Sequence, residues 1–154
     1  MAYLAEGIGT TKGVVAILDA LGTEGNLSWN TDLARKVSAQ TGAAIVISGP
    51  IDIVADSNEA WAIRNGHPMM ANITGTGCMS AGVIGCCVGA DPQALLPSCV
   101  CAMSAMGICG ELAYEKLLSV DGGSGTYRVL LMDAMSKLDG TPLTHRSKAE
   151  RLRI

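Results

Sequence analysis

The sequence predicts an α/β domain, and three observations lead to that class. A helical pattern over residues 31–41 is followed at once by a continuous apolar segment over residues 43–47, which is typical of a strand buried in a parallel sheet. Two further short apolar segments follow, and the remainder of the chain is mostly helical in pattern. The chain has 154 residues, of which 49% are hydrophobic and 16% charged, which suits one domain with its own core.

The first elements are predicted from caps, apolar faces and turn residues. Residues 2–25 are weakly patterned and rich in glycine, so we expect loops with a short helical piece there. The helix over residues 31–41 is predicted from an N-cap, an apolar face and a terminal glycine: Asn30 or Thr31, then Leu33, Ala34 and Val37, then Gly42.

A meander of strands is expected next. Residues 51–55 and 60–64 are the first two strands, with a turn at residues 56–58 between them. Asn65-Gly66 is typical of a type I′ hairpin turn, which predicts a third strand over residues 68–73.

Three helices are predicted in the second half. The first covers residues 78–88, and the second begins at Asp91-Pro92 and runs to about Leu118, with Pro97 expected to kink it or delay its start. The third runs from a Thr126 cap to about Leu138. Prolines and serines interrupt the apolar stretch of the second helix, which favours a buried helix over a membrane span.

Composition excludes several classes of function. The net charge of −3 and the lack of a dominant basic face argue against nucleic-acid binding. Four cations gather near the C-terminus, and residues 141–154 are interpreted as a basic, solvated tail: Arg146, Lys148, Arg151 and Arg153. The six cysteines form no Cys-x-x-Cys pair and only two histidines are present, so no metal site is expected. The start of the chain does not resemble a signal peptide, which predicts reduced thiols and a cytoplasmic protein.

The candidate site is the segment Thr74-Gly75-Thr76-Gly77-Cys78, between a predicted strand and a predicted helix. The first amides of a helix have no internal partner, and the helix dipole adds positive charge there. Glycines let an anion approach that backbone closely, so the segment predicts a phosphate or oxyanion cradle. A tight strand-to-helix turn without a ligand would use the same residues, and no P-loop lysine is present. Cys78 falls in the first turn, where a thiol would point at the anion, although a small apolar residue would serve there as well.

The segment also carries a resemblance to a known family. Asn-Gly-His-Pro-Met-Met at residues 65–70, followed by Ile-Thr-Gly-Thr-Gly-Cys-Met-Ser-Ala at residues 73–81, resembles the signature of hydroxyethylthiazole kinase, of the ribokinase-like superfamily. Shorter similarities at residues 12–14, 45–49, 107–111 and 130–134 fall in the family's order. The resemblance implies that residues 1–140 are the C-terminal part of a ribokinase-like three-layer α/β/α fold.

The resemblance implies an activity and roles for particular residues. The family transfers the γ-phosphoryl group of ATP, with Mg²⁺, to the hydroxyl of 4-methyl-5-(2-hydroxyethyl)thiazole in thiamine salvage, and it works as a cytoplasmic homotrimer. Gly75 would contribute to the substrate site, and Ser48 stands where the family has a threonine that contacts ATP. Gly75, Thr76 and Gly77 would form the anion hole, with Cys78 where related sugar kinases place an aspartate base.

Only the C-terminal part of the family is matched, so the chain is expected to lack most of the central sheet, the substrate-closing residues and the acidic groups near Mg²⁺. Two alternatives therefore stand beside a thiazole kinase: a non-catalytic phosphate-binding module and a ribokinase-like kinase of another small alcohol. Cys78 argues against the latter, and the cysteine spacings lack the motif of a thiol-redox protein. Outside the segment, His67 is interpreted as a turn residue and Asp52 and Asp56 as solvent-facing, while Glu111 has no partner that the sequence identifies.

Overall fold

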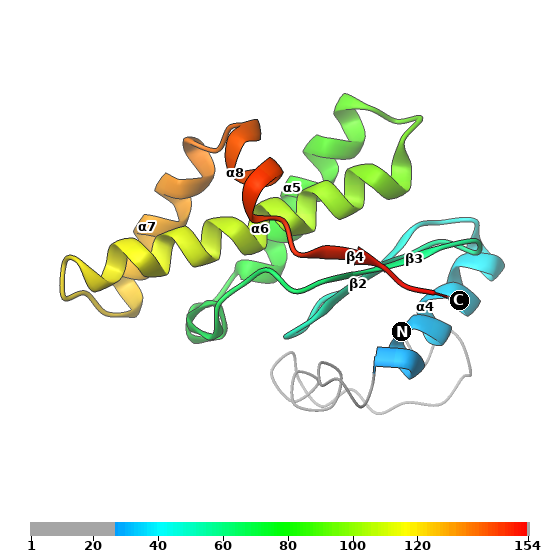
Figure 1. Cartoon of the computed structure of the whole chain (residues 1–154), viewed down its shortest axis with the longest axis horizontal. Coiled ribbons are helices and arrows are strands. Elements are labelled where there is room, and N and C mark those ends of the chain that lie inside the picture. The colour runs from blue at the N-terminus through cyan, green and yellow to red at the C-terminus, as the bar shows by residue number, and fades with distance from the viewer. Residues whose placement is uncertain (1–26, 154) are drawn as a thin grey trace. The chain divides into compact units, whose positions relative to one another are not determined.

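A computed structural model of the chain describes residues 27–153, and these confirm the α/β class (Figure 1). The helices and strands fall into two compact units. One contains the residues up to Ile63 and those from Glu150 onward, and the other contains residues 64–149. The predictions for residues 2–25 lie outside the described residues.

The first unit is a helix on a small sheet. Its elements are α4 (Leu27–Thr41), β1 (Ile45–Ile47), β2 (Asp52–Ala55) and β3 (Ala60–Ile63), and β4 (Ala149–Arg151) completes a sheet of order β1-β2-β3-β4. β1 pairs with β2, and β2 with β3, both antiparallel. The prediction of a parallel sheet from the continuous apolar run over residues 43–47 is therefore wrong. Both β1 and β2 are apolar because α4 packs on them and buries their side chains.

Helix α4 begins earlier than its pattern predicted. Asn30 and Thr31 lie inside the helix, and the Thr31 hydroxyl donates to the Leu27 carbonyl at 2.7 Å instead of capping the first turn. The predicted apolar face is confirmed, since Leu33, Ala34 and Val37 are buried against the sheet. The predicted end is confirmed as well, because Gly42 adopts a φ of +70° directly after the helix.

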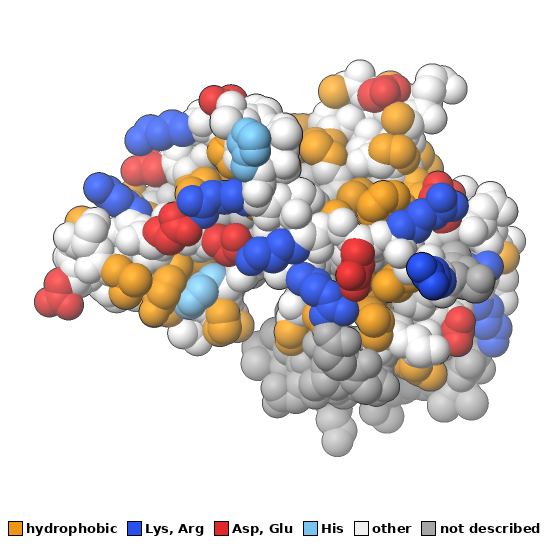
Figure 2. All heavy atoms as spheres, in the orientation of Figure 1, with side chains coloured by type: hydrophobic (Ala, Val, Ile, Leu, Met, Phe, Trp, Pro, Cys, Tyr) orange, Lys and Arg blue, Asp and Glu red, His pale blue; other side chains and the backbone are white. Residues whose placement is uncertain are grey.

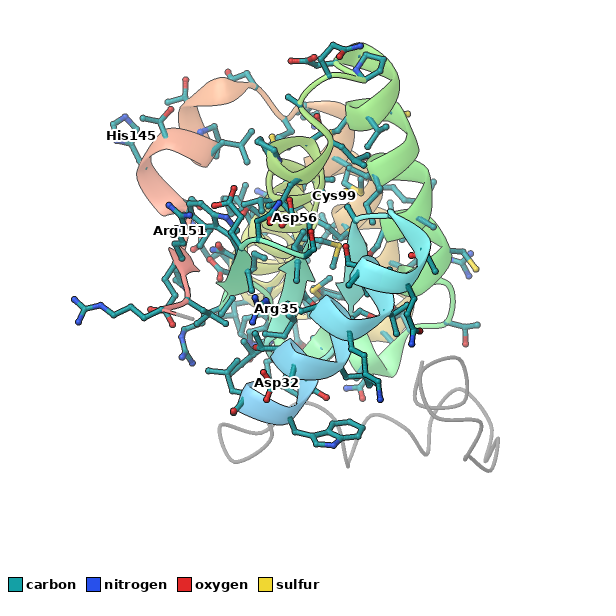
Figure 3. All side chains as sticks on the ribbon, turned by 90° about the vertical axis from the view of Figure 1, so that its right-hand side faces the viewer. Asp32, Arg35, Asp56, Cys99, His145 and Arg151 are labelled. Atoms are coloured by element: carbon teal, nitrogen blue, oxygen red, sulfur yellow. The ribbon has the colours of Figure 1, made fainter. Side chains whose placement is uncertain are left out.

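A hydrogen bond joins α4 to the turn between β2 and β3. Asp56 Oδ1 accepts hydrogen bonds from the amides of Asn58 and Glu59 at 2.7 and 2.8 Å, which closes the predicted turn. Arg35 of α4 donates from Nη2 to the carbonyl of Ser57 in that turn at 3.2 Å, and Figure 3 labels Arg35 and Asp56.

The second unit is helical, and it contains no third meander strand. Its elements in chain order are the 3₁₀-helix η2 (Pro68–Asn72) and the α-helices α5 (Thr76–Ala90), α6 (Leu95–Leu118), α7 (Ser124–Ser136) and α8 (Gly140–Arg146). The predicted hairpin at Asn65-Gly66 is wrong, because only Gly66 adopts a positive φ (+132°) and a type I′ turn needs two such residues. Pro68, which lacks an amide hydrogen, starts η2 instead.

Helix α6 forms the core of this unit. It starts at Leu95 rather than at Asp91, so Pro97 delays the start as expected and occupies the first turn. Its middle packs against α7, where the buried Tyr127 donates from its hydroxyl to the Gly110 carbonyl at 3.0 Å. Within residues 27–153, α6 is the one helix long and apolar enough to cross a membrane, and 67% of its most apolar window is buried by the rest of the chain.

Helix α7 begins at Ser124 with Gly123 as its N-cap, so the predicted Thr126 cap is wrong and Thr126 lies within the first turn. A Cβ atom at Gly122, in the loop before the helix, would lie 2.7 Å from Thr126 Cβ, so this loop packs closely on the first turn.

The segment after residue 140 has regular structure, and none of its residues up to Arg153 is buried. It forms α8 and β4, and the Leu152 amide donates to the Ala60 carbonyl at 2.9 Å. Three of the four cations make ion pairs: Arg146 with Glu115 at 2.7 Å, Lys148 with Glu111 at 2.8 Å and Arg151 with Glu59 at 2.9 Å. Figure 2 shows Lys and Arg side chains interspersed with Asp and Glu on the visible face, and no basic patch.

Candidate anion site at the start of α5

The glycine segment forms the turn into α5. Gly75 is the N-cap, with φ +104° and ψ 0°, a left-handed conformation that strains any residue with a Cβ atom. Among residues 27–153, no side chain caps this end of the helix, and a Cβ placed at Gly75 or Gly77 would meet no atom within 4 Å. Within the described part of the chain, the two glycine positions are therefore uncovered.

The backbone amides at this end supply the chemistry. The first helical bond runs from the Met79 amide to the Gly75 carbonyl at 2.9 Å, so the amides of Thr76, Gly77 and Cys78 precede it and have no partner within the helix. α5 contains 15 residues, and its dipole places partial positive charge at this end. The arrangement can hold a phosphoryl group or another oxyanion.

Cys78 lies in the first turn of α5, and its side chain is exposed. The structure thus brings Gly75, Thr76, Gly77 and Cys78 together at one helix end, as the sequence predicted. The donors that this turn offers to an anion are the amides of Thr76, Gly77 and Cys78.

The segment before the turn is held by His67 and η2. His67 is the N-cap of η2, and its Nδ1 accepts a hydrogen bond from the Met69 amide at 3.1 Å. Its ring stacks on that of Tyr114 of α6, with centroids 3.5 Å apart. Ile73 is buried beside α6 and α7 just before the glycines. His67 therefore fixes the entry to the turn, in agreement with its interpretation as a turn residue.

Glu111 of α6 is the partner of the Asn65-Gly66 segment. Its Oε1 accepts from the Gly66 amide at 3.1 Å, from Asn65 Nδ2 at 3.2 Å and from Lys148 Nζ at 2.8 Å. Burial opposes ionisation of this carboxyl, but the hydrogen bonds from Lys148, Gly66 and Asn65 hold its pKa below the ordinary value. A glutamate inside an apolar helix was the only sequence signal for this contact.

Asn65 completes the same network. Its Nδ2 also donates to the Arg146 carbonyl at 2.9 Å, and its Oδ1 accepts from the Lys148 amide at 2.7 Å. Gly107 of α6 lies directly against Asn65, so the segment is fixed from both sides.

In the first unit, Ser48 follows β1 and is exposed. The loop that contains it is held by Asp52, whose Oδ1 accepts from the Gly49 amide at 2.9 Å. Asp52 is buried, so its interpretation as solvent-facing is wrong. Burial raises its pKa to about 7, and the hydrogen bond from Gly49 opposes that shift. The apolar neighbours of Asp52 on both sides in the sequence were the signal for its burial.

Residues 27–153 contain no group of three or more His, Cys, Asp or Glu side chains that could hold a metal ion. These residues therefore do not by themselves supply a carboxylate cage for Mg²⁺.

Comparison with known proteins gives one consistent family. The model of the hydroxyethylthiazole kinase family matches residues 3–141. A hydroxyethylthiazole kinase of Desulfovibrio desulfuricans is 47% identical, over 99% of this chain and 56% of that protein. One from Clostridium acetobutylicum is 40% identical, over 96% of this chain and 54% of that protein. The chain thus spans about half the length of the curated relatives that it matches.

A solved structure shows the same fold. The hydroxyethylthiazole kinase protein from Pyrococcus horikoshii matches with a TM-score of 0.74 at 24% identity, over 93% of this chain and 53% of that one. This likeness supports the expected α/β fold over almost the whole chain.

Proposed function

The chain belongs to the hydroxyethylthiazole kinase family, and we propose that it carries the phosphate-holding part of such a kinase. In the proposed reaction, ATP gives its γ-phosphoryl group to the hydroxyl of the thiazole alcohol, in the cytoplasm and as a step of thiamine salvage. The observation that supports this most is the glycine-lined start of α5, which no side chain of residues 27–153 caps and whose first amides have no partner within the helix.

Phosphoryl transfer suits such a site. Its transition state is loose and spreads negative charge over the oxygens of the moving group, so positioning and charge stabilisation carry most of the catalysis. The amides of Thr76, Gly77 and Cys78 would donate to those oxygens without having to reorganise. Gly75 would let the substrate hydroxyl approach the backbone, because no Cβ stands in the way. Cys78 has a modest role in this proposal.

The remaining assignments follow from family membership. Ser48 would contact ATP, Mg²⁺ would accompany the nucleotide, and the protein would work as a homotrimer. The groups that enclose the thiazole ring and bind the metal would come from the half of the relatives that this chain does not span.

Two measurements test the proposal. The first is ATP turnover with the thiazole alcohol by this chain joined to the N-terminal half of the Desulfovibrio desulfuricans kinase. Turnover is expected, and its absence in a folded, soluble fusion would refute the kinase assignment. The second uses this chain alone, with NMR amide shifts of residues 75–78 followed during titration with ADP. Shifts confined to this turn are expected. Gly85→Ala is the control variant, because a Cβ added at Gly85 would meet no atom of residues 27–153 within 4 Å.

A second candidate is a phosphate-binding module without turnover. The observation in its favour is the half-length match to the relatives. ADP shifts at residues 75–78 without turnover in the fusion would favour it over the kinase.

A further inference from the structure

One face of α6 holds the segment that leads into the glycine turn. The contacts join Gly107 to Asn65, Gly110 to Met70, Glu111 to Gly66 and Tyr114 to His67. The four α6 residues stand at positions i, i+3, i+4 and i+7, which lie on one side of a helix, so they meet the segment together. The last of these contacts differs from the others because it joins two side-chain rings.

The contact between Tyr114 and His67 fixes the His67 side chain. The ring centroids lie 3.5 Å apart, and the ring planes are inclined by 18°. His67 Nδ1 accepts from the Met69 amide at 3.1 Å, so the neutral ring carries its proton on Nε2. The His67 carbonyl accepts from the Met70 amide at 2.9 Å. Because both acceptors of His67 serve the first amides of η2, the position of its ring sets where η2 begins.

Helix η2 passes this position on to the glycine turn over a short distance. Ile73 is the C-cap of η2, and its side chain is buried in the core that α6 and α7 share. Only Thr74 lies between Ile73 and Gly75, the N-cap of α5. A shift of η2 along α6 would therefore move the amides of the turn, because a single residue separates the two caps.

We propose that Tyr114 is a positioning residue of the anion site, which sets the place of the amides at residues 75–78 through His67 and η2. This inference rests on the proposed function of that turn in holding the moving phosphoryl group. Tyr114 lies outside every segment that carries the family resemblance, so the motif gives it no role. Groups that stabilise a transition state must be held within about 0.5 Å of their place, and a misplacement of about 1 Å can lower turnover on the order of 100-fold.

The position of the turn is measured first on this chain without any ligand. Residual dipolar couplings of the amides of residues 75–78 report how their N–H bonds are oriented relative to α6. Tyr114→Leu removes the ring and should change these couplings, whereas Tyr114→Phe keeps a ring for His67 and should leave them unchanged. Couplings that stay the same in a folded Tyr114→Leu chain would overturn the proposal, whatever the turn binds.

His67→Asn covers the case in which Tyr114→Leu does not fold. Asparagine keeps a side-chain acceptor for the Met69 amide but offers no ring to Tyr114. The couplings of residues 75–78 should therefore change as they do in Tyr114→Leu. Unchanged couplings in His67→Asn would show that the capping bond alone positions the turn, and would equally overturn the role of Tyr114.

Activity separates a positioning residue from one that only stabilises the fold. The variants are placed in the fusion with the N-terminal half of the Desulfovibrio desulfuricans kinase. Tyr114→Leu should lower kcat on the order of tenfold, as for a shift of about 0.5 Å. The KM for ATP should change less than kcat, because the amides of the turn act mainly on the transition state. Tyr114→Phe should restore kcat.

The outcomes distinguish this inference from the proposed function. An unsubstituted fusion without turnover refutes the kinase assignment, and the couplings then decide the role of Tyr114 alone. An active fusion in which Tyr114→Leu has the kcat of the unsubstituted protein overturns the positioning role. Equal losses in Tyr114→Leu and Tyr114→Phe would assign the effect to the hydroxyl instead of the stacked ring, and would overturn the role as well.

Discussion

A single methyl group at Gly107 tests how firmly the Asn65-Gly66 segment is held against α6. A Cβ at Gly107 would lie 2.6 Å from the Asn65 carbonyl carbon and 2.7 Å from its carbonyl oxygen. Contacts of this length are not tolerated, and the obstacle is backbone that cannot rotate away. In Gly107→Ala, therefore, Asn65 has to move.

The size of the effect follows from what that movement breaks. Carbon atoms approach to about 3.5 Å, so Asn65 must shift by roughly 0.9 Å. Its bonds to the Arg146 carbonyl at 2.9 Å and from the Lys148 amide at 2.7 Å would then exceed hydrogen-bonding distance. Two lost hydrogen bonds and the overpacking cost about 3 kcal/mol, against about 1 kcal/mol gained from alanine in a helix. The free energy of unfolding should fall by about 2 kcal/mol.

Urea unfolding followed by far-UV circular dichroism measures this change. With a denaturant slope of about 2 kcal/mol/M, the midpoint of Gly107→Ala should fall by about 1 M. Gly85→Ala is the matched control, because Gly85 also lies within a helix of the second unit and nothing stands within 4 Å of an added Cβ. Its midpoint should rise by about 0.5 M.

The decisive result is that the two glycine-to-alanine substitutions should shift the urea midpoint in opposite directions. If Gly107→Ala raised the midpoint as Gly85→Ala does, Asn65 could not lie against α6, and the account of how the segment before the glycine turn is positioned would be refuted.

Three further outcomes are expected. In a full-length kinase carrying this chain, Gly75→Val should lower turnover on the order of 100-fold, because valine blocks the approach to the backbone and is strained at a φ of +104°. Cys78→Ser should lower turnover by less than about tenfold. Similar losses in the two variants would contradict a backbone anion site. Burial raises the pKa of Asp52 from 3.8 to about 7, so between these pH values the folded state holds a proton that the unfolded state releases. The free energy of unfolding should therefore fall on the order of 4 kcal/mol as the pH rises from 3.8 through 7. Asp52→Asn should flatten that pH profile of urea midpoints, and an unchanged slope would show that another group is responsible. Glu111→Gln keeps an acceptor for the Gly66 amide and should lower the free energy of unfolding by about 1 kcal/mol. Glu111→Leu leaves the donors of Glu111 unpaired and should lower it by about 3 kcal/mol. Equal losses in urea unfolding would show that the acceptor does not matter.

The glycine turn into α5 could be predicted because its signal is local. Gly75 and Gly77 lie within a few residues of the helix that they begin, and both the backbone freedom of glycine and the unpaired amides of a first turn are properties of neighbouring residues. The residues that position this turn could not be predicted in the same way. Glu111, for example, contacts Gly66 across 45 positions of sequence.

The errors in the element predictions have one cause. Asn65-Gly66 is a favourable hairpin sequence, but the bonds from Asn65 to α6 and to the Lys148 backbone replace those of a hairpin. The same holds for the cations near the C-terminus, where local charge suggested a solvated segment and pairing with β3 made a strand.

By itself the sequence determined the mixed helix and strand content, the apolar face of α4, the glycine turn into α5, and the family resemblance. Tertiary structure alone decided the antiparallel pairing, the position of β4 beside β3, and the burial of Asp52. The division is physical: dihedral preferences and unpaired amides are set within a turn of chain, whereas burial and strand partners depend on which distant segments exclude water together.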